Sequence, residues 1–132
     1  MEELTEKRVW QRVRGETDPL QRVRGMLADQ GALLGTYRVF SRRGGAWRRL
    51  YEQKEEQTAC LRGVLRMMTG QCTARPRCGC LPDLAACFPP ERRLLEELTE
   101  LSREGEWAPL FGLLLDRQKS QCRLLLELLG TM

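Results

Sequence analysis

Histidine is absent from this 132-residue sequence, and other features that mark common functional classes are missing too. Without histidine, no Ser–His–Asp triad can form. No stretch approaches the roughly 20 consecutive apolar residues that a transmembrane helix needs. The opening segment, MEELTEKRVW, lacks the apolar core of a signal peptide. These absences predict a cytoplasmic protein that has no membrane partner.

Aromatic residues are also scarce, at 6% of the chain, whereas leucine dominates the apolar residues. That balance favours helices over sheets. The length suits one domain with one core. The net charge is only +4, and basic residues alternate with acidic ones along most of the chain. A nucleic-acid-binding protein usually gathers its basic residues on one face, so the sequence predicts no nucleic-acid partner.

Helix-breaking residues divide the chain into four long helical segments and a shorter first one. Thr17-Asp18-Pro19 is a helix start signal, and Gly70 is a stop signal. The helices are expected at about 3–14, 18–42, 46–69, 90–104 and 106–129. Residues 70–90 are rich in proline, glycine and cysteine, which predicts a long linker. Two tight hairpins joined by a long crossover are typical of a four-helix bundle.

Three of the apolar helical stripes are interrupted by polar residues near their middles. The interruptions are Gln30 in the first stripe, Lys54 and Thr58 in the second, and Gln118 and Gln121 in the third. Their spacing of three and four residues places them on the inward faces. Buried polar groups cost free energy unless they are paired. A layer of them therefore predicts either a buried site or a buried hydrogen-bond network.

The segments Gln30–Tyr37, Leu50–Leu61 and Asp116–Leu124 carry a family resemblance. In helix order and spacing, residues 18–131 resemble the ferritin-like superfamily and, within it, the small rubrerythrin-like bacterial proteins. The resemblance implies an all-α, ferritin-like four-helix bundle with a long crossover between its second and third helices. In that family, two helices each supply a glutamate and two supply Glu-x-x-His, and these residues hold two iron or manganese ions. A redox site is implied only where those ligands are present.

In this chain the resemblance places other residues at most of the ligand positions. Gln30 takes the position on the first bundle helix, and Glu55 and Thr58 take those on the second. The helix expected at 90–104 offers Arg93 or Leu94 and no carboxylate on its leucine stripe. The last helix offers Gln118 and Gln121 or, by a second alignment, Leu115 and Gln118.

Only Glu55 remains as a strong ligand under these alignments. One carboxylate cannot neutralise two divalent cations, and amides and hydroxyls bind iron weakly. We therefore expect no di-metal centre and no catalytic residue. In its place we expect a buried hydrogen-bond network that contains a Lys54–Glu55 ion pair. The plainer alternative is that both side chains turn outward to solvent.

Four cysteines lie close together in the expected linker, in the spacing C-x5-C-x-C-x6-C. They are Cys72, Cys78, Cys80 and Cys87. Reduced cysteines in a flexible loop are one interpretation, and a four-thiolate zinc or iron site is another, although no Cys-x2-Cys pair is present. A third is a reactive Cys-Gly-Cys whose thiol pKa values are lowered by nearby arginines. Cys60 and Cys122 lie on expected helices, where small buried residues are common.

These observations favour a non-catalytic structural or interaction protein without a resident cofactor. The last helix carries more leucines than one inward face needs, which favours a homodimer or another protein partner. Those residues are Leu124, Leu125, Leu126, Leu128 and Leu129. The alternatives are a di-iron or manganese redox protein with a remodelled site, and a bundle whose cysteine-rich loop binds zinc or iron.

Overall fold

The computed structural model describes residues 18–131, and within them helices pack against one another and no strand forms. The four long helices are α2 (Pro19–Phe40), α3 (Gly45–Thr69), α4 (Phe88–Leu101) and α5 (Ala108–Gly130). Short 3-10 turns, η1 (Ser41–Arg43) and η2 (Ala85–Cys87), precede α3 and α4. The expected all-α class is confirmed. The helix expected at about 3–14 lies outside the described residues.

Local sequence signals explain where the first hairpin begins and ends. The Asp18 side chain accepts a hydrogen bond from the Leu20 N–H at 3.1 Å, which caps α2. Pro19 occupies the first turn, where a missing N–H leaves no helical bond unmade. Gly44 and Gly70 both adopt a φ of 72°, a conformation that glycine takes more readily than other residues. These two glycines bracket α3.

The helix α4 begins at Phe88, two residues before the expected start, and ends at Leu101 instead of 104. Pro89 and Pro90 fit inside its first turn, because the N–H groups there have no partner within the helix. The turn between α4 and α5 is correspondingly longer than expected and includes Gly105, whose φ is 110°.

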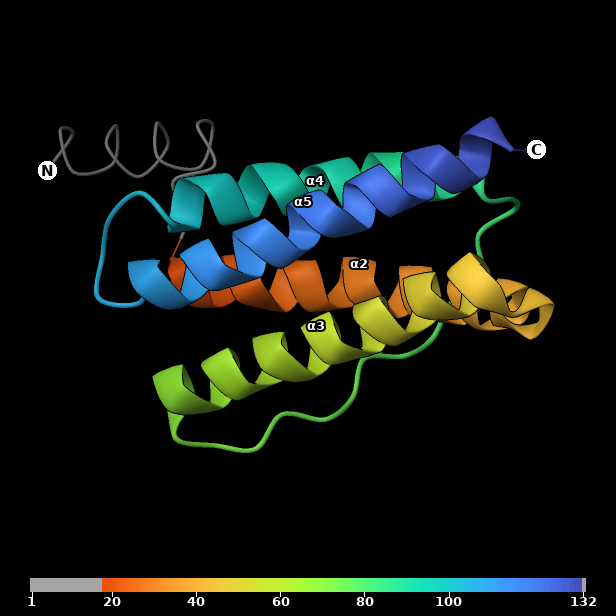
Figure 1. The fold of residues 1–132 in the computed structure, drawn as a ribbon. Helices are drawn as coiled ribbons and strands as arrows, with labels where there is room; N and C mark the ends of the chain where they lie inside the picture. Colours follow the sequence, from red (N-terminus) through yellow and green to blue (C-terminus); the bar gives the residue numbers. More distant parts are fainter. Residues whose placement is uncertain (1–17, 132) are drawn as a thin grey trace, which may run out of the picture.

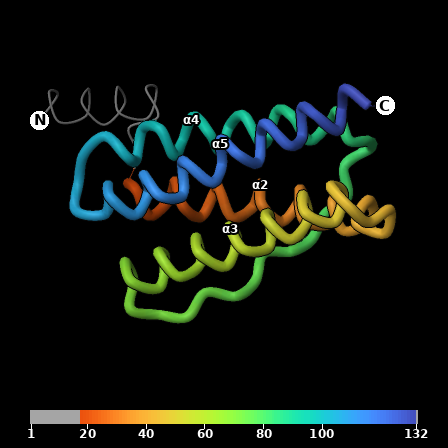
Figure 2. Tube along the Cα trace, in the orientation of Figure 1, coloured from red at the N-terminus to blue at the C-terminus, as the bar shows by residue number. Residues whose placement is uncertain are grey.

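The four helices form two antiparallel hairpins, α2 with α3 and α4 with α5 (Figure 1). The hairpins lie side by side, so that α3 is next to α5 and α2 is next to α4. An ion pair between Arg93 Nη2 and Asp29 Oδ1, at 2.9 Å, links α4 to α2. The trace in Figure 2 shows the long crossover returning along α3 before it rises to the start of α4.

Two glycines on α2 allow the crossover to lie directly against the helix backbone. A Cβ atom added at Gly35 would lie 1.5 Å from Gly79 O, and one at Gly31 would lie 2.2 Å from another crossover carbonyl oxygen. The Gly79 N–H donates to Gly31 O at 3.1 Å, and the Leu81 N–H donates to Thr36 Oγ1 at 2.8 Å. The crossover is therefore held mainly through its backbone.

Most leucines expected to form a partner surface belong to the chain's own core. Leu124, Leu125 and Leu128 are buried against the other helices, and Leu129 is half-buried. Only Leu126 of this group is largely exposed. The stripe that the buried leucines form faces α3 and α4, so these residues supply little of a partner surface, and the homodimer itself stays a prediction. Along residues 18–131, no helix has both the length and the apolar character needed to cross a bilayer.

Candidate functional site

The centre of the four helices holds a fully buried lysine. Lys54 of α3 has 0% exposed side-chain area. Its Nζ donates to Glu91 Oε1 at 2.6 Å, to Gln57 Oε1 at 2.9 Å and to Gln118 Oε1 at 3.3 Å. A protonated lysine has three N–H donors. Each of them has an acceptor here, so the hydrogen-bonding capacity of the ammonium group is filled by protein atoms.

The partner of this lysine is Glu91, in the first turn of α4, which is equally buried. Its Oε1 accepts from Lys54 Nζ and from Gln118 Nε2, the latter at 3.0 Å. Its Oε2 accepts from the Tyr37 hydroxyl at 2.8 Å. The Gln118 Nε2 also donates to the Glu91 carbonyl oxygen at 2.9 Å. Both carboxylate oxygens are therefore occupied by donors from other helices.

We call this group the Lys54–Glu91 network: Tyr37 from α2, Lys54 and Gln57 from α3, Glu91 from α4 and Gln118 from α5. All four helices contribute, so the network joins the two hairpins. Removing two charges from water costs several kcal/mol per ion, and the attraction between them roughly offsets that cost. The network therefore adds little net stability but penalises any register in which one charge loses its partner.

Burial shifts the pKa values of several groups around this pair. Desolvation lowers the pKa of Lys54, while the nearby Glu91 carboxylate opposes that shift. Desolvation and then Glu91 raise the pKa of the Tyr37 hydroxyl far above its ordinary value. The same two causes raise the pKa of the Cys87 thiol to about 12 and raise that of Cys122. Both shifts disfavour the thiolate, which is the reactive form of cysteine.

The expected Lys54–Glu55 pair does not form. Successive residues on a helix point about 100° apart, so two neighbours cannot both face the same interior. Lys54 takes the inward position, and Glu55 turns toward the crossover. There Glu55 Oε1 accepts from the Tyr51 hydroxyl at 2.8 Å and lies 3.5 Å from Arg75 Nη2, with 39% of its side chain exposed. The one strong ligand expected from the sequence is thus outside the core.

Four other expected ligand residues are buried, namely Gln30, Thr58, Gln118 and Gln121. Of these, only Gln118 joins the network. The Thr58 hydroxyl donates to the Lys54 carbonyl oxygen of its own helix at 2.8 Å. Gln121 Nε2 donates to Leu50 O at 3.1 Å. The buried Oε1 atoms of Gln30 and Gln121 accept no hydrogen bond from any described residue. A cavity of about 10 Å³ lies beside Gln30, which is room for about one water-sized group.

Sequence reasoning missed Glu91. The expected ligand on this helix was Arg93 or Leu94, yet Arg93 faces Asp29 at the surface and Leu94 is apolar core. A signal was available, because Glu91 lies three residues before Leu94 and so continues the leucine stripe by one turn. The structure begins α4 at Phe88 and buries Glu91 one turn before the first leucine of the stripe.

The four linker cysteines are not brought together. Cys72, Cys78 and Cys80 are exposed, whereas Cys87 is buried next to α4. Within residues 18–131, no three cysteine, aspartate or glutamate side chains are grouped so that they could hold a metal ion. The crossover is extended along α2 and α3, which separates the thiols, and Gly79 faces α2 between Cys78 and Cys80. The four-thiolate arrangement is therefore absent from this conformation.

The buried donor set does not fit two divalent metal ions. It contains one carboxylate, whose two oxygens already accept hydrogen bonds, and a lysine that adds positive charge at the same place. Divalent iron or manganese needs several free carboxylate or imidazole ligands. Comparisons of the chain with protein-family models, with curated proteins and with solved structures found no match.

Proposed function

We propose that this protein is a metal-free member of the ferritin-like superfamily that serves as a structural or interaction module. The observation that carries the proposal is the Lys54 ammonium, which lies 2.6 Å from Glu91 at the centre of the helices. In the proposed relatives, metal cations balance the carboxylates of this layer. Here one lysine supplies the positive charge, and a single glutamate supplies the negative charge.

The distribution of buried polar residues over the helices supports the proposed kinship. In ferritin-like proteins, two helices carry one ligand each and two carry a pair at i and i+3. In this chain α3 and α5 each bury a polar i, i+3 pair, Lys54 with Gln57 and Gln118 with Gln121. The helix α4 buries the single Glu91. The α3 pair lies one residue earlier than the Glu55 and Thr58 positions expected from the sequence.

The network has the properties of a fixed structural element. Its charges are paired, its lysine donors are saturated, and burial keeps its tyrosine and neighbouring thiols protonated. A general acid or base needs a pKa near the working pH and a path to substrate. Such a network instead fixes the register of the two hairpins, and a rigid helical surface suits an interaction role.

Metal analysis of the purified chain under reducing conditions tests this proposal. We expect no stoichiometric iron, manganese or zinc after incubation with each metal. The matched variants are Glu91→Gln, which alters the core, and Cys78→Ser, which alters the crossover. About two iron or manganese ions per chain, lost in Glu91→Gln but kept in Cys78→Ser, would falsify the proposal in favour of a remodelled redox site. The opposite pattern with zinc or iron would place a metal site in the crossover.

A further inference from the structure

A groove between α3 and α5 leaves apolar side chains exposed at one end. Gly63 and Met67 of α3 and Leu110 and Leu113 of α5 line this end, whose volume is about 370 Å³. Met67 is 53% exposed and Leu113 is 64% exposed, which makes them two of the most exposed large apolar residues in the described part of the chain. Exposed apolar residues that gather on one surface are typical of sites that contact a partner.

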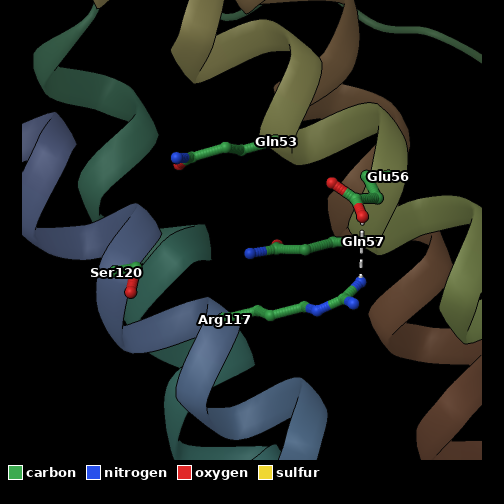
Figure 3. A pocket seen from close by; sticks show the side chains of 5 residues that line it. All are labelled: Gln53, Glu56, Gln57, Arg117 and Ser120. Carbon is green, nitrogen blue, oxygen red and sulfur yellow. Dashed lines mark ion pairs between the residues drawn. The ribbon is translucent and has the colours of Figure 1, made fainter.

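The groove continues into a polar half of about 240 Å³ at the middle of the two helices (Figure 3). Glu56 of α3 and Arg117 of α5 face each other across it, with Arg117 Nη1 3.4 Å from Glu56 Oε1. Gln53 projects from α3 toward α5, and its buried Oε1 accepts no hydrogen bond from any described residue. The α3 edge of the groove is thus acidic at the height where the α5 edge is basic.

We propose that this groove is the contact surface of a homodimer. Its two-fold axis runs parallel to α3 and α5, above the groove that separates them. Such an axis places α3 of one protomer against α5 of its partner without shifting either along its length. Glu56 then faces the partner's Arg117, and Arg117 faces the partner's Glu56. The apolar ends meet as well, because Met67 and Leu113 line the same end of the groove and the axis keeps that end of each protomer at the same height. One groove thus matches its own copy in charge and in apolar character.

A second charged pair supports the same symmetry. Arg49 lies seven residues before Glu56, and Glu127 lies seven residues after Ser120, so helical spacing keeps each on the groove side of its helix. Both residues are exposed. Because α3 and α5 run antiparallel, Arg49 and Glu127 lie at similar heights along the groove. The axis therefore brings Arg49 near the partner's Glu127, and Glu127 near the partner's Arg49. Opposite charges therefore meet at two heights.

The size of this face is adequate for a stable dimer. A 23-residue helix such as α5 is about 35 Å long, and two adjacent helices are about 20 Å wide. Their common face measures about 700 Å² per protomer, close to the roughly 800 Å² per partner of a standard protein interface. The dimer adds a partner to the interaction role proposed above, but it does not depend on the metal-free core.

Sedimentation equilibrium of the full chain and two leucine variants tests the surface. We expect a wild-type dimer and, for Leu113→Glu, a dissociation constant raised by roughly tenfold or more, as for a buried apolar contact residue. Leu126→Glu is the matched control, since Leu126 is a similarly exposed leucine on another face of α5. A wild-type chain that stays monomeric into the high micromolar range, or equal loss of dimer in both variants, overturns the proposal.

Charge reversal tests the axis itself through residues that are already exposed. Glu56→Arg and Arg117→Glu should each weaken the homodimer, because each places like charges opposite each other at two points. A mixture of the two variants should form a heterodimer with both pairs restored, which native mass spectrometry detects. Circular dichroism checks that each variant remains helical. Homodimers at wild-type strength in either variant, or a mixture without heterodimers, overturn the proposed axis, and metal analysis of the same samples tests the core separately.

Discussion

Replacing Glu91 with glutamine removes the negative charge beside Lys54 while keeping the shape of the side chain. The ammonium would then be buried with only amide oxygens around it, so the lysine is expected to lose its proton instead. Removing the proton from a lysine of ordinary pKa at pH 7 costs about 4–5 kcal/mol. Breaking other buried ion pairs costs about 3–5 kcal/mol, which agrees with this limit. We therefore expect Glu91→Gln to lower the free energy of unfolding by about 3–5 kcal/mol.

Urea denaturation monitored by circular dichroism measures this loss, and Glu96→Gln is the matched control. Glu96 lies on the same helix and pairs with Arg92 at 3.2 Å, but 64% of its side chain is exposed. Exposed pairs contribute about 0–1 kcal/mol, so the control variant should unfold almost like the wild type. The double variant Lys54→Met/Glu91→Gln should be more stable than Glu91→Gln alone, because it contains no buried charge.

The pH dependence gives a further check on the same variant. In Glu91→Gln the folded chain holds Lys54 neutral while the unfolded chain still binds its proton. The unfolded state then binds more protons, and stability rises with pH until the lysine is neutral in both states, near pH 10. The defect in Glu91→Gln should therefore shrink between about pH 7 and about pH 10. A loss below about 1 kcal/mol, or a double variant that shows the sum of both single losses, would refute the reasoning.

Three further predictions concern other parts of the fold. Gly35→Ala should destabilise the chain, because the added Cβ would overlap Gly79 O. Gly25→Ala on the same helix is the control: nothing lies within 4 Å of its added Cβ, so it should stabilise the chain by about 0.5–1 kcal/mol. Thermal unfolding measures both effects, and equal effects of the two variants would contradict the close approach of the crossover to α2. Because burial raises the pKa of Tyr37, its hydroxyl should ionise in an alkaline absorbance titration only as the chain unfolds, and its contribution to stability should be lost above about pH 10. Tyr37→Phe should therefore remove the late-titrating absorbance signal, and Tyr51→Phe should not. With a disulfide reagent, the exposed thiols of Cys72, Cys78 and Cys80 should react in a fast phase, and the buried Cys87 thiol should react only on unfolding. A change in the fast phase in Cys87→Ser would contradict this prediction.

The helix order and the inward faces were accessible from the sequence because they depend on local signals. Helix breakers and caps separate the hairpins, and a period of 3.6 residues places Lys54 and Gln118 inward. Both are fully buried in the structure. Periodicity gives the direction of a side chain but not its partner across the core. The sequence therefore located Lys54 and paired it with the adjacent Glu55 instead of the distant Glu91.

The path of the crossover was not accessible from composition. Its proline and glycine content predicted a long connection, but its position depends on backbone contacts with α2, such as Gly79 N–H to Gly31 O. Backbone groups are common to all residues, so they leave no pattern of side-chain types. The only trace is the pair Gly31 and Gly35, spaced by one helical turn. The spread of the cysteines follows from this path and was likewise hidden.

The Lys54–Glu91 network also bears on how fast the chain folds and unfolds. Its members are distant in sequence: Lys54 and Glu91 are 37 residues apart, and Lys54 and Gln118 are 64 apart. Each hairpin can form from contacts between its own two helices, whereas the ion pair closes only when both hairpins have docked. Contacts that form after the transition state affect unfolding far more than folding. We therefore expect the ion pair to govern how long the folded chain survives, and the two hairpins to govern how quickly it forms.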